Sequence, residues 1–153
     1  MKKKIFNIIT ILIIVLMLTG CGGSEKASTS YSDLIGPWQL DSRYVDTAPQ
    51  SAPLIILDFK KGQEVDIYAY LDSKGETWYN TKDEIPSMSE YTYIETSAVT
   101  VGGGKLSYEY KGETISAEYK LNVNSYILHF YIENEDGKII HELYKTADKS
   151  LRP

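Results

Sequence analysis

The chain has 153 residues, of which 16 are basic and 21 acidic, giving a formal net charge of −5 at pH 7. An acidic chain is repelled by nucleic acid and by anionic membrane surfaces, so both are poor candidates for partners. The single cysteine excludes an internal disulfide, so the stability must come from an apolar core.

The N-terminal segment has the features of an export signal. Three lysines precede an apolar run over residues 5–18, which is interrupted only by Asn7 and Thr10. The run is 14 residues long, whereas a membrane-spanning helix needs about 20. We therefore predict a signal peptide over residues 1–20, with an uncleaved signal anchor as the alternative.

The end of this run, Leu18-Thr19-Gly20-Cys21, resembles a bacterial lipobox. The resemblance implies that the Cys21 thiol receives a diacylglyceryl group and that the signal is cut just before it. Two acyl chains hold a protein stably on a membrane, whereas one holds it only marginally. We therefore expect a lipid-anchored protein on the extracytoplasmic face of the cell membrane.

Cleavage before Cys21 would leave 133 residues, and the loss of three lysines would leave 13 basic against 21 acidic residues, a charge of −8. Residues 21–31 contain the cysteine and a Gly- and Ser-rich stretch without apolar periodicity, which predicts a flexible tether. Such a tether reaches about 15–20 Å. Residues 32–153 then have the length of one domain.

The domain sequence is dominated by strand signals. The clearest is 114–123, where Ile115, Ala117 and Tyr119 share one face with later apolar residues and polar residues occupy the other. Closely spaced turns make sequence neighbours pair in space, which predicts an all-β antiparallel up-and-down meander. Closure removes exposed sheet edges and favours a barrel of about eight strands, with a β-sandwich as the alternative. The expected strands are 34–45, 54–59, 64–71, 90–101, 106–110, 114–123, 126–133 and 138–146.

The motif Gly36-Pro37-Trp38 resembles the Gly-x-Trp opening of lipocalin-like domains, and the strand order over about residues 34–146 is similar to that family's. The resemblance implies a barrel in which Trp38 plugs the closed end. It also implies a basic side chain over the tryptophan, supplied by Lys145 or Arg152, and an interior that holds one small apolar ligand. The alternative for Trp38 is an ordinary core aromatic.

Residues 72–89 form a long connection that contains Trp78 and Tyr79 among charged residues. Long loops of this kind often act as lids or binding loops, so we predict that these two aromatic residues guard the mouth of the barrel. The alternative is a short strand over 76–80, in which Trp78 packs against the sheet.

Tyrosines recur two residues apart, which places each pair on one face of a strand. Tyr108 and Tyr110 lie on an apolar face and are expected to point inward, where their hydroxyls could bind a ligand, as could that of Tyr119. Tyr68 and Tyr70 oppose an apolar face and are expected to point outward, where they could form a sticky patch.

His129 and His141 lie in the last predicted hairpin, and their relation depends on its turn. A two-residue loop puts them on opposite faces and separates apolar from charged residues better. A three-residue loop with Gly137 left-handed puts both histidines and Tyr131 on one face, and the turn residues favour it. Two histidines lack a third ligand, so no metal site is expected.

No catalytic nucleophile arrangement, phosphate loop, zinc-protease motif or calcium loop is present in the sequence. We therefore expect a protein that is not an enzyme and needs no cofactor. The favoured function is binding of a small apolar or amphipathic ligand inside the barrel. The alternative is a module whose outer tyrosines and acidic face contact another envelope protein; a solidly packed interior would favour it, and an internal cavity would favour the ligand.

Overall fold

The computed structural model describes residues 27–79 and 86–147, so the predicted signal peptide, Cys21 and Arg152 lie outside the described residues. Within these described ranges, nine strands form the main sheet, and two short strands, one helix and one 3-10 helix accompany them. The main strands are β2 (Gly36–Val45), β4 (Ile55–Lys60), β5 (Glu64–Ala69), β6 (Thr92–Ala98), β7 (Thr100–Gly102), β8 (Lys105–Tyr110), β9 (Glu113–Asn122), β10 (Ile127–Glu133) and β11 (Ile139–Thr146). The others are β1 (Ala27–Ser28), α2 (Tyr31–Leu34), β3 (Ala48–Gln50) and η1 (Met88–Glu90).

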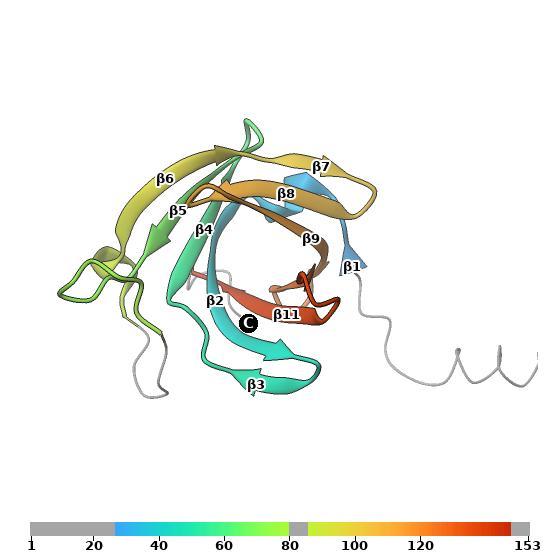
Figure 1. Ribbon diagram of the computed structural model, residues 1–153. Coiled ribbons are helices and arrows are strands. Elements are labelled where there is room, and N and C mark those ends of the chain that lie inside the picture. Colours follow the sequence, from blue (N-terminus) through green and yellow to red (C-terminus); the bar gives the residue numbers. More distant parts are fainter. Residues whose placement is uncertain (1–26, 80–85, 148–153) are drawn as a thin grey trace, which may run out of the picture.

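The strands follow the order β6-β5-β4-β2-β11-β10-β9-β8-β7, and all pairings are antiparallel. Except for β6 and β7, which end the order, main strands that follow one another in the chain are neighbours in the sheet, and β2 and β11 join the two halves into the ring seen in Figure 1. The predicted all-β antiparallel meander and its barrel form are confirmed.

The barrel is closed by a bend in the chain. β6 pairs with β5 and β7 pairs with β8, and only Val99 separates β6 from β7. Beyond β7, side chains bridge β6 to β8: the Glu109 N–H donates to Ser97 Oγ at 2.8 Å, and the Lys111 N–H donates to Glu95 Oε1 at 2.6 Å. If β6 and β7 are counted as one bent strand, the nearly closed barrel has the expected eight strands.

One end of the barrel is closed by the segment that precedes β2. Trp38 is buried and its indole N–H donates to the Leu34 carbonyl at 2.7 Å, while the Tyr31 hydroxyl donates to the Lys60 carbonyl at 2.8 Å. β1 pairs with β9, with Ala27 opposite Asn122. Residues 27–31, which the sequence assigned to the tether, are therefore part of the folded domain.

A bulge in β2 decides which of its side chains face inward. Against β11, Leu40 is opposite Tyr144 and Ser42 is opposite Leu143, so Asp41 is an extra residue between them. An extra residue reverses the alternation beyond it. Trp38 and Leu40 face the core before the bulge, and Arg43 rather than Ser42 faces inward after it.

The last hairpin has the three-residue loop. Tyr131 is opposite His141 and His129 is opposite Leu143, and Gly137 has a φ of 74°. The register that places both histidines and Tyr131 on one face is therefore correct, and the two-residue alternative is wrong. This face is the outer one, because Phe130 and Tyr144 on the other face are buried in the core.

Candidate functional site

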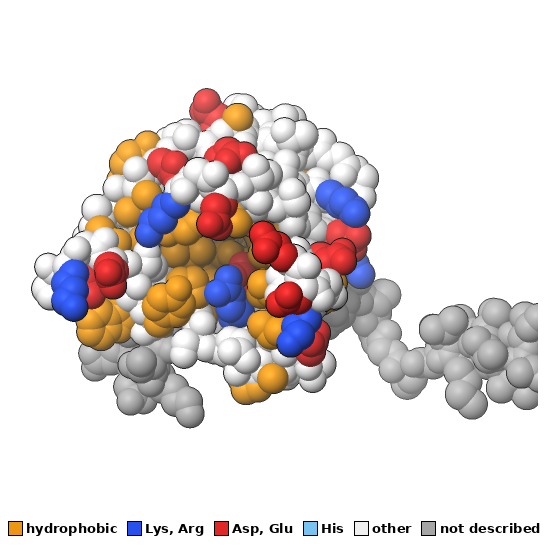
Figure 2. Space-filling view, in the orientation of Figure 1, with side chains coloured by type: hydrophobic (Ala, Val, Ile, Leu, Met, Phe, Trp, Pro, Cys, Tyr) orange, Lys and Arg blue, Asp and Glu red, His pale blue; other side chains and the backbone are white. Residues whose placement is uncertain are grey.

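The barrel interior is filled at the closed end and less completely covered at the opposite end. The partly buried side chains that pack on the core there come from several strands and from the connection after β5: Leu71, Ile94, Tyr110, Ile115 and Ile132. Figure 2 shows hydrophobic side chains recessed at the centre of the ring of strands, with acidic and basic side chains around them. We call this hollow the barrel recess.

A polar cluster lies inside the barrel beside these side chains. The Nε and Nη2 atoms of Arg43 lie 2.9 and 2.8 Å from Oε1 of Glu142. The Tyr144 hydroxyl donates to Glu142 Oε2 at 2.7 Å. Tyr108, also buried, interacts with the Tyr144 hydroxyl. We call these four residues the interior cluster.

The interior cluster is built around a buried carboxylate. The Glu142 side chain is only 4% exposed, and a buried charge is costly unless it is paired and hydrogen-bonded. Arg43 neutralises it, and both of its oxygens accept hydrogen bonds. Burial, and secondarily the negative charge of Glu142, raise the pKa values of the Tyr108 and Tyr144 hydroxyls. Both hydroxyls therefore keep their protons at neutral pH.

Arg43 has donors that the cluster does not use. A guanidinium group carries five N–H donors, and the bonds to Glu142 involve Nε and Nη2 only. The Arg43 side chain is 29% exposed, and because it faces inward, solvent reaches it through the barrel recess. Guanidinium N–H groups bind carboxylates and other anions, so this position in the recess is suited to a negatively charged ligand group.

The predicted ligand-binding tyrosines do not form one site. Tyr108 belongs to the interior cluster, and Tyr110 is half-buried at the rim, with its hydroxyl 3.5 Å from Thr77 Oγ1. Tyr119 lies toward the closed end, where its hydroxyl donates to the Thr29 carbonyl. Only Tyr108 and Tyr110 are therefore beside the barrel recess.

Trp78 and Tyr79 lie on the surface, with 48% and 50% of their areas exposed. The backbone of Trp78 bonds to Tyr70 and Leu54 at 2.8 Å in each case, and isolated bridges at Thr77 and Tyr79 join the segment to neighbouring chain without forming the strand of the alternative prediction. Trp78 lines a hollow of about 790 Å3 together with Leu54 and Tyr70. Leu54 and Tyr70 belong to a small second apolar cluster on the outer face of the sheet, not to the barrel core. The predicted outward orientation of Tyr68 and Tyr70 agrees with their place in this cluster.

Lys145 does not lie over Trp38, contrary to the expectation from the lipocalin-like resemblance. It is opposite Gln39 in the sheet, one residue from Trp38 and therefore on the other face. Its ammonium group forms an ion pair with Asp41 at 2.8 Å.

The sequence reasoning missed both charged members of the interior cluster. A signal for Glu142 was present, because the three-residue loop places it on the inward face with Phe130 and Tyr144. Arg43 points inward because of the bulge at Asp41, and the residue types in β2 give no signal that a bulge occurs there.

Within residues 27–79 and 86–147, no group of three or more His, Cys, Asp or Glu side chains is placed to hold a metal ion. The same part of the chain contains no helix that is long and apolar enough to span a membrane.

No protein-family model and no curated protein sequence matches the chain. Among solved structures, the similar ones include the fluorescent protein UnaG. The wild-type crystal structure has a TM-score of 0.39 at 14% identity and covers 76% of this chain and 99% of its own. A point mutant has a TM-score of 0.40 at 13% identity and covers 78% of this chain and 100% of its own. At this distance the similarity carries no information about function.

Proposed function

We propose that this protein is a lipid-anchored, extracytoplasmic binding protein that holds a small amphipathic anion in the barrel recess. The observation that carries the proposal is the inward-facing Arg43, which is partly exposed at the recess and has N–H donors that its bonds to Glu142 do not use. The anionic group would lie against Arg43, and the apolar part against Tyr110, Ile115 and Ile132.

The packing of the interior supports an amphipathic ligand rather than a wholly enclosed apolar one. The closed half is filled by buried side chains, so a ligand would enter only the open half and its remaining length would reach the rim. A ligand in this position benefits from a hydrophobic wall and one charged contact, the usual composition of a small-molecule site.

The membrane anchor is supported by the sequence alone. The basic start, the short apolar run and the lone Cys21 occur in the order expected for an exported lipoprotein. An anchored binding protein would collect its ligand at the cell surface without any catalytic step. Replacement of Cys21 by Ser should release the protein from the membrane fraction; an unchanged membrane fraction would contradict the anchor and leave the barrel site untouched.

The binding proposal is tested with a dansyl-labelled fatty acid and its uncharged amide. We expect the acid to bind more tightly than the amide to the purified protein. The ratio of the dissociation constants of amide and acid should fall by about tenfold or more in a variant with both Arg43→Gln and Glu142→Gln, since a bond to a charged group contributes roughly 1.5–3 kcal/mol. This double variant leaves no unpaired charge in the interior.

The matched control is Lys145→Gln, which removes a cation from an ion pair on the outer face and should not change binding. Equal affinities for acid and amide in the wild-type protein would contradict the proposal, as would unchanged binding in the double variant. Native mass spectrometry of the purified protein would show whether a natural anion is carried along.

A further inference from the structure

The outer face of the last hairpin carries several apolar and aromatic side chains between the charged residues Glu133 and Lys145. Its outward side chains include His129, Tyr131, Ile139, His141 and Leu143, which we call the hairpin face. On the adjacent β9, the outward residues are all polar or charged. In an antiparallel sheet with one wet face the outer side chains are normally polar, so apolar residues on both faces indicate that both faces are covered.

The aromatic rings of the hairpin face are held in order by stacking. Tyr131 and His141 stack with ring centroids 4.5 Å apart, and His129 and His141 stack at 5.3 Å. Nδ1 of His129 and Nε2 of His141 lie 3.1 Å apart. Tyr44 of β2 extends the row, with its ring 6.1 Å from that of His141. Because the rings are already fixed, a partner that binds them loses little side-chain freedom in doing so.

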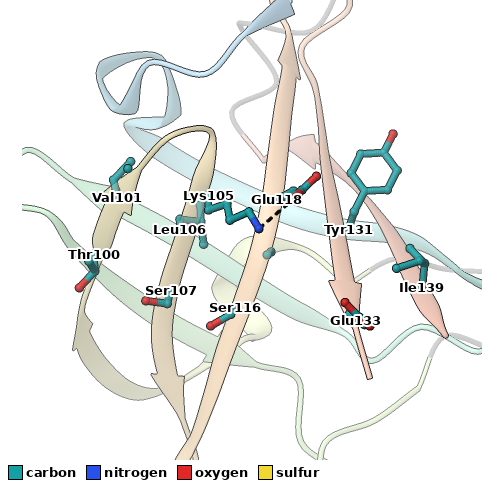
Figure 3. A pocket seen from close by; sticks show the side chains of 12 residues that line it. Thr100, Val101, Lys105, Leu106, Ser107, Ser116, Glu118, Tyr131, Glu133 and Ile139 are labelled. Carbon is teal, nitrogen blue, oxygen red and sulfur yellow. Dashed lines mark ion pairs between the residues drawn. The ribbon is translucent and has the colours of Figure 1, made fainter. Parts of the chain in front are cut away.

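Two grooves meet at the hairpin face, each of about 550 Å3. One crosses β7, β8 and β9 and is shown in Figure 3, where Tyr131 and Ile139 stand along one side of it. The other lies beside β2 and is lined by Tyr44 and Asp46. Tyr131 and Ile139 line both grooves, and Ile139 is 43% exposed, so these two residues form an apolar ridge between them.

The charges along the grooves select the partner. Three carboxylates line them, from Asp46, Glu118 and Glu133. The cationic lining residue is Lys105, and it already forms an ion pair with Glu118 at 3.3 Å. The lining of the two grooves therefore carries a net negative charge, which attracts a cationic partner and disfavours an anionic membrane or a second acidic copy of this chain.

We propose that the hairpin face docks a basic amphipathic segment of a partner protein. Its apolar side chains would lie in the grooves on either side of the Tyr131–Ile139 ridge, and its Lys or Arg side chains would pair with Glu133 and Asp46. This surface is outside the barrel, so the proposal does not depend on a ligand in the recess.

The probe is a fluorescently labelled peptide of alternating Lys and Leu, about eight residues long to match an ordinary strand. Its counterpart alternates Glu and Leu. Fluorescence anisotropy should show binding of the Lys peptide and not of the Glu peptide, with weaker binding at high salt. Tyr131→Ser should weaken binding by about tenfold, the effect of losing a central interface residue.

Two matched variants control for general effects. Tyr93→Ser removes a tyrosine that is 52% exposed on β6, away from both grooves, and should leave binding unchanged. Glu133→Gln should weaken the binding of the Lys peptide, whereas Glu64→Gln at the start of β5 should not. Thermal unfolding of each variant checks that the barrel remains folded.

The proposal is overturned if the Tyr131→Ser protein is folded and binds the Lys peptide like the wild type. Equal binding of the Glu peptide also overturns it. A dimer in analytical ultracentrifugation that Tyr131→Ser abolishes would make a second copy the occupant, and binding to anionic vesicles that depends on Tyr131 would make it a membrane. Either result replaces the proposed partner.

Discussion

The two ends of the barrel interior satisfy their buried polar groups differently. At the closed end, Trp38 and Tyr31 donate to backbone carbonyls, those of Leu34 and Lys60. At the open end, Arg43, Glu142 and Tyr144 bond to one another through side chains. The closed end thus depends on acceptors whose positions the backbone fixes, and the open end on side chains, of which Arg43 has donors that the cluster does not use.

This difference separates the roles of the two ends. The Leu34 carbonyl is bonded to a tryptophan that is itself buried, so the closed end contributes mainly to stability. A guanidinium group with unused N–H donors can bind its carboxylate and a ligand at the same time. Changes at the closed end should therefore alter stability, and changes at the open end should alter binding.

The largest expected effect is at the closed end. Trp38→Ala removes a buried aromatic side chain and its hydrogen bond to Leu34, which should lower the free energy of unfolding by about 3–5 kcal/mol. Denaturant unfolding measures this loss. The control is Trp78→Ala, which removes a half-exposed ring and should cost about 1 kcal/mol or less. Equal losses for the two variants would contradict the role of Trp38 as a plug.

The next effect is at the open end. Arg43→Gln leaves the Glu142 carboxylate buried without its counter-charge, which should cost about 3 kcal/mol. Adding Glu142→Gln removes the stranded charge and should restore most of the stability without restoring the preference for anions. Chemical unfolding together with titration of the dansyl probe separates the two outcomes. A double variant that is no more stable than Arg43→Gln would show that the ion pair does not govern this end.

The buried tyrosine hydroxyls should make the free energy of unfolding decrease at alkaline pH. The pKa values of Tyr108 and Tyr144 are raised in the folded protein, mainly by burial. The stabilisation that the two tyrosines give to the folded protein is complete below their pKa in the unfolded chain, which is about 10. It is lost as the pH rises above that value, because the unfolded chain then releases the protons and the folded protein does not.

The contribution of each tyrosine to this decline grows with pH and approaches about 1.4 kcal/mol per pH unit well above pH 10. Unfolding free energies measured between about pH 9 and pH 11 should fall less steeply for Tyr108→Phe than for the wild type. Identical slopes would argue against a buried Tyr108 hydroxyl.

The smallest effect is on the outer surface. Burial lowers the pKa of His141. The folded protein therefore binds this proton less readily than the unfolded chain does, so stability present above about pH 6.5 is lost as the pH falls below it. The melting temperature should decline slightly on acidification, and His141→Gln should flatten the decline. A steeper decline in that variant would contradict the assignment.

The parts of the fold fixed by local pattern were predictable from the sequence. In β9 the strict alternation determines the inward face. In the last hairpin Asn134-Glu135-Asp136-Gly137 favours the loop that is found, whereas the separation of apolar from charged residues favoured the other register. The folded conformation of residues 27–31 was not predictable, because their polar composition indicates a tail. The pairing of β1 with β9, which lies far away in the sequence, is what orders them.

The candidate site was predictable only in part. Tyr108 and Tyr110 follow from the alternation in β8. The position of Arg43 depends on the bulge at Asp41, which arises from how β2 pairs with β11, far away in the sequence. Without the bulge, Arg43 would point outward and Glu142 would have no partner from β2. This non-local pairing is why the chemical centre of the site was missed.

The role of the open end is tested most directly by the arginine side chains themselves. The chain contains two arginines, Arg43 and Arg152, so protein labelled with nitrogen-15 arginine gives two Nε–H signals by NMR. On titration with a medium-chain fatty acid, the Arg43 signal should shift and saturate, and the Arg152 signal should not follow it. An Arg43 signal that does not move while the fatty acid binds elsewhere would contradict the account.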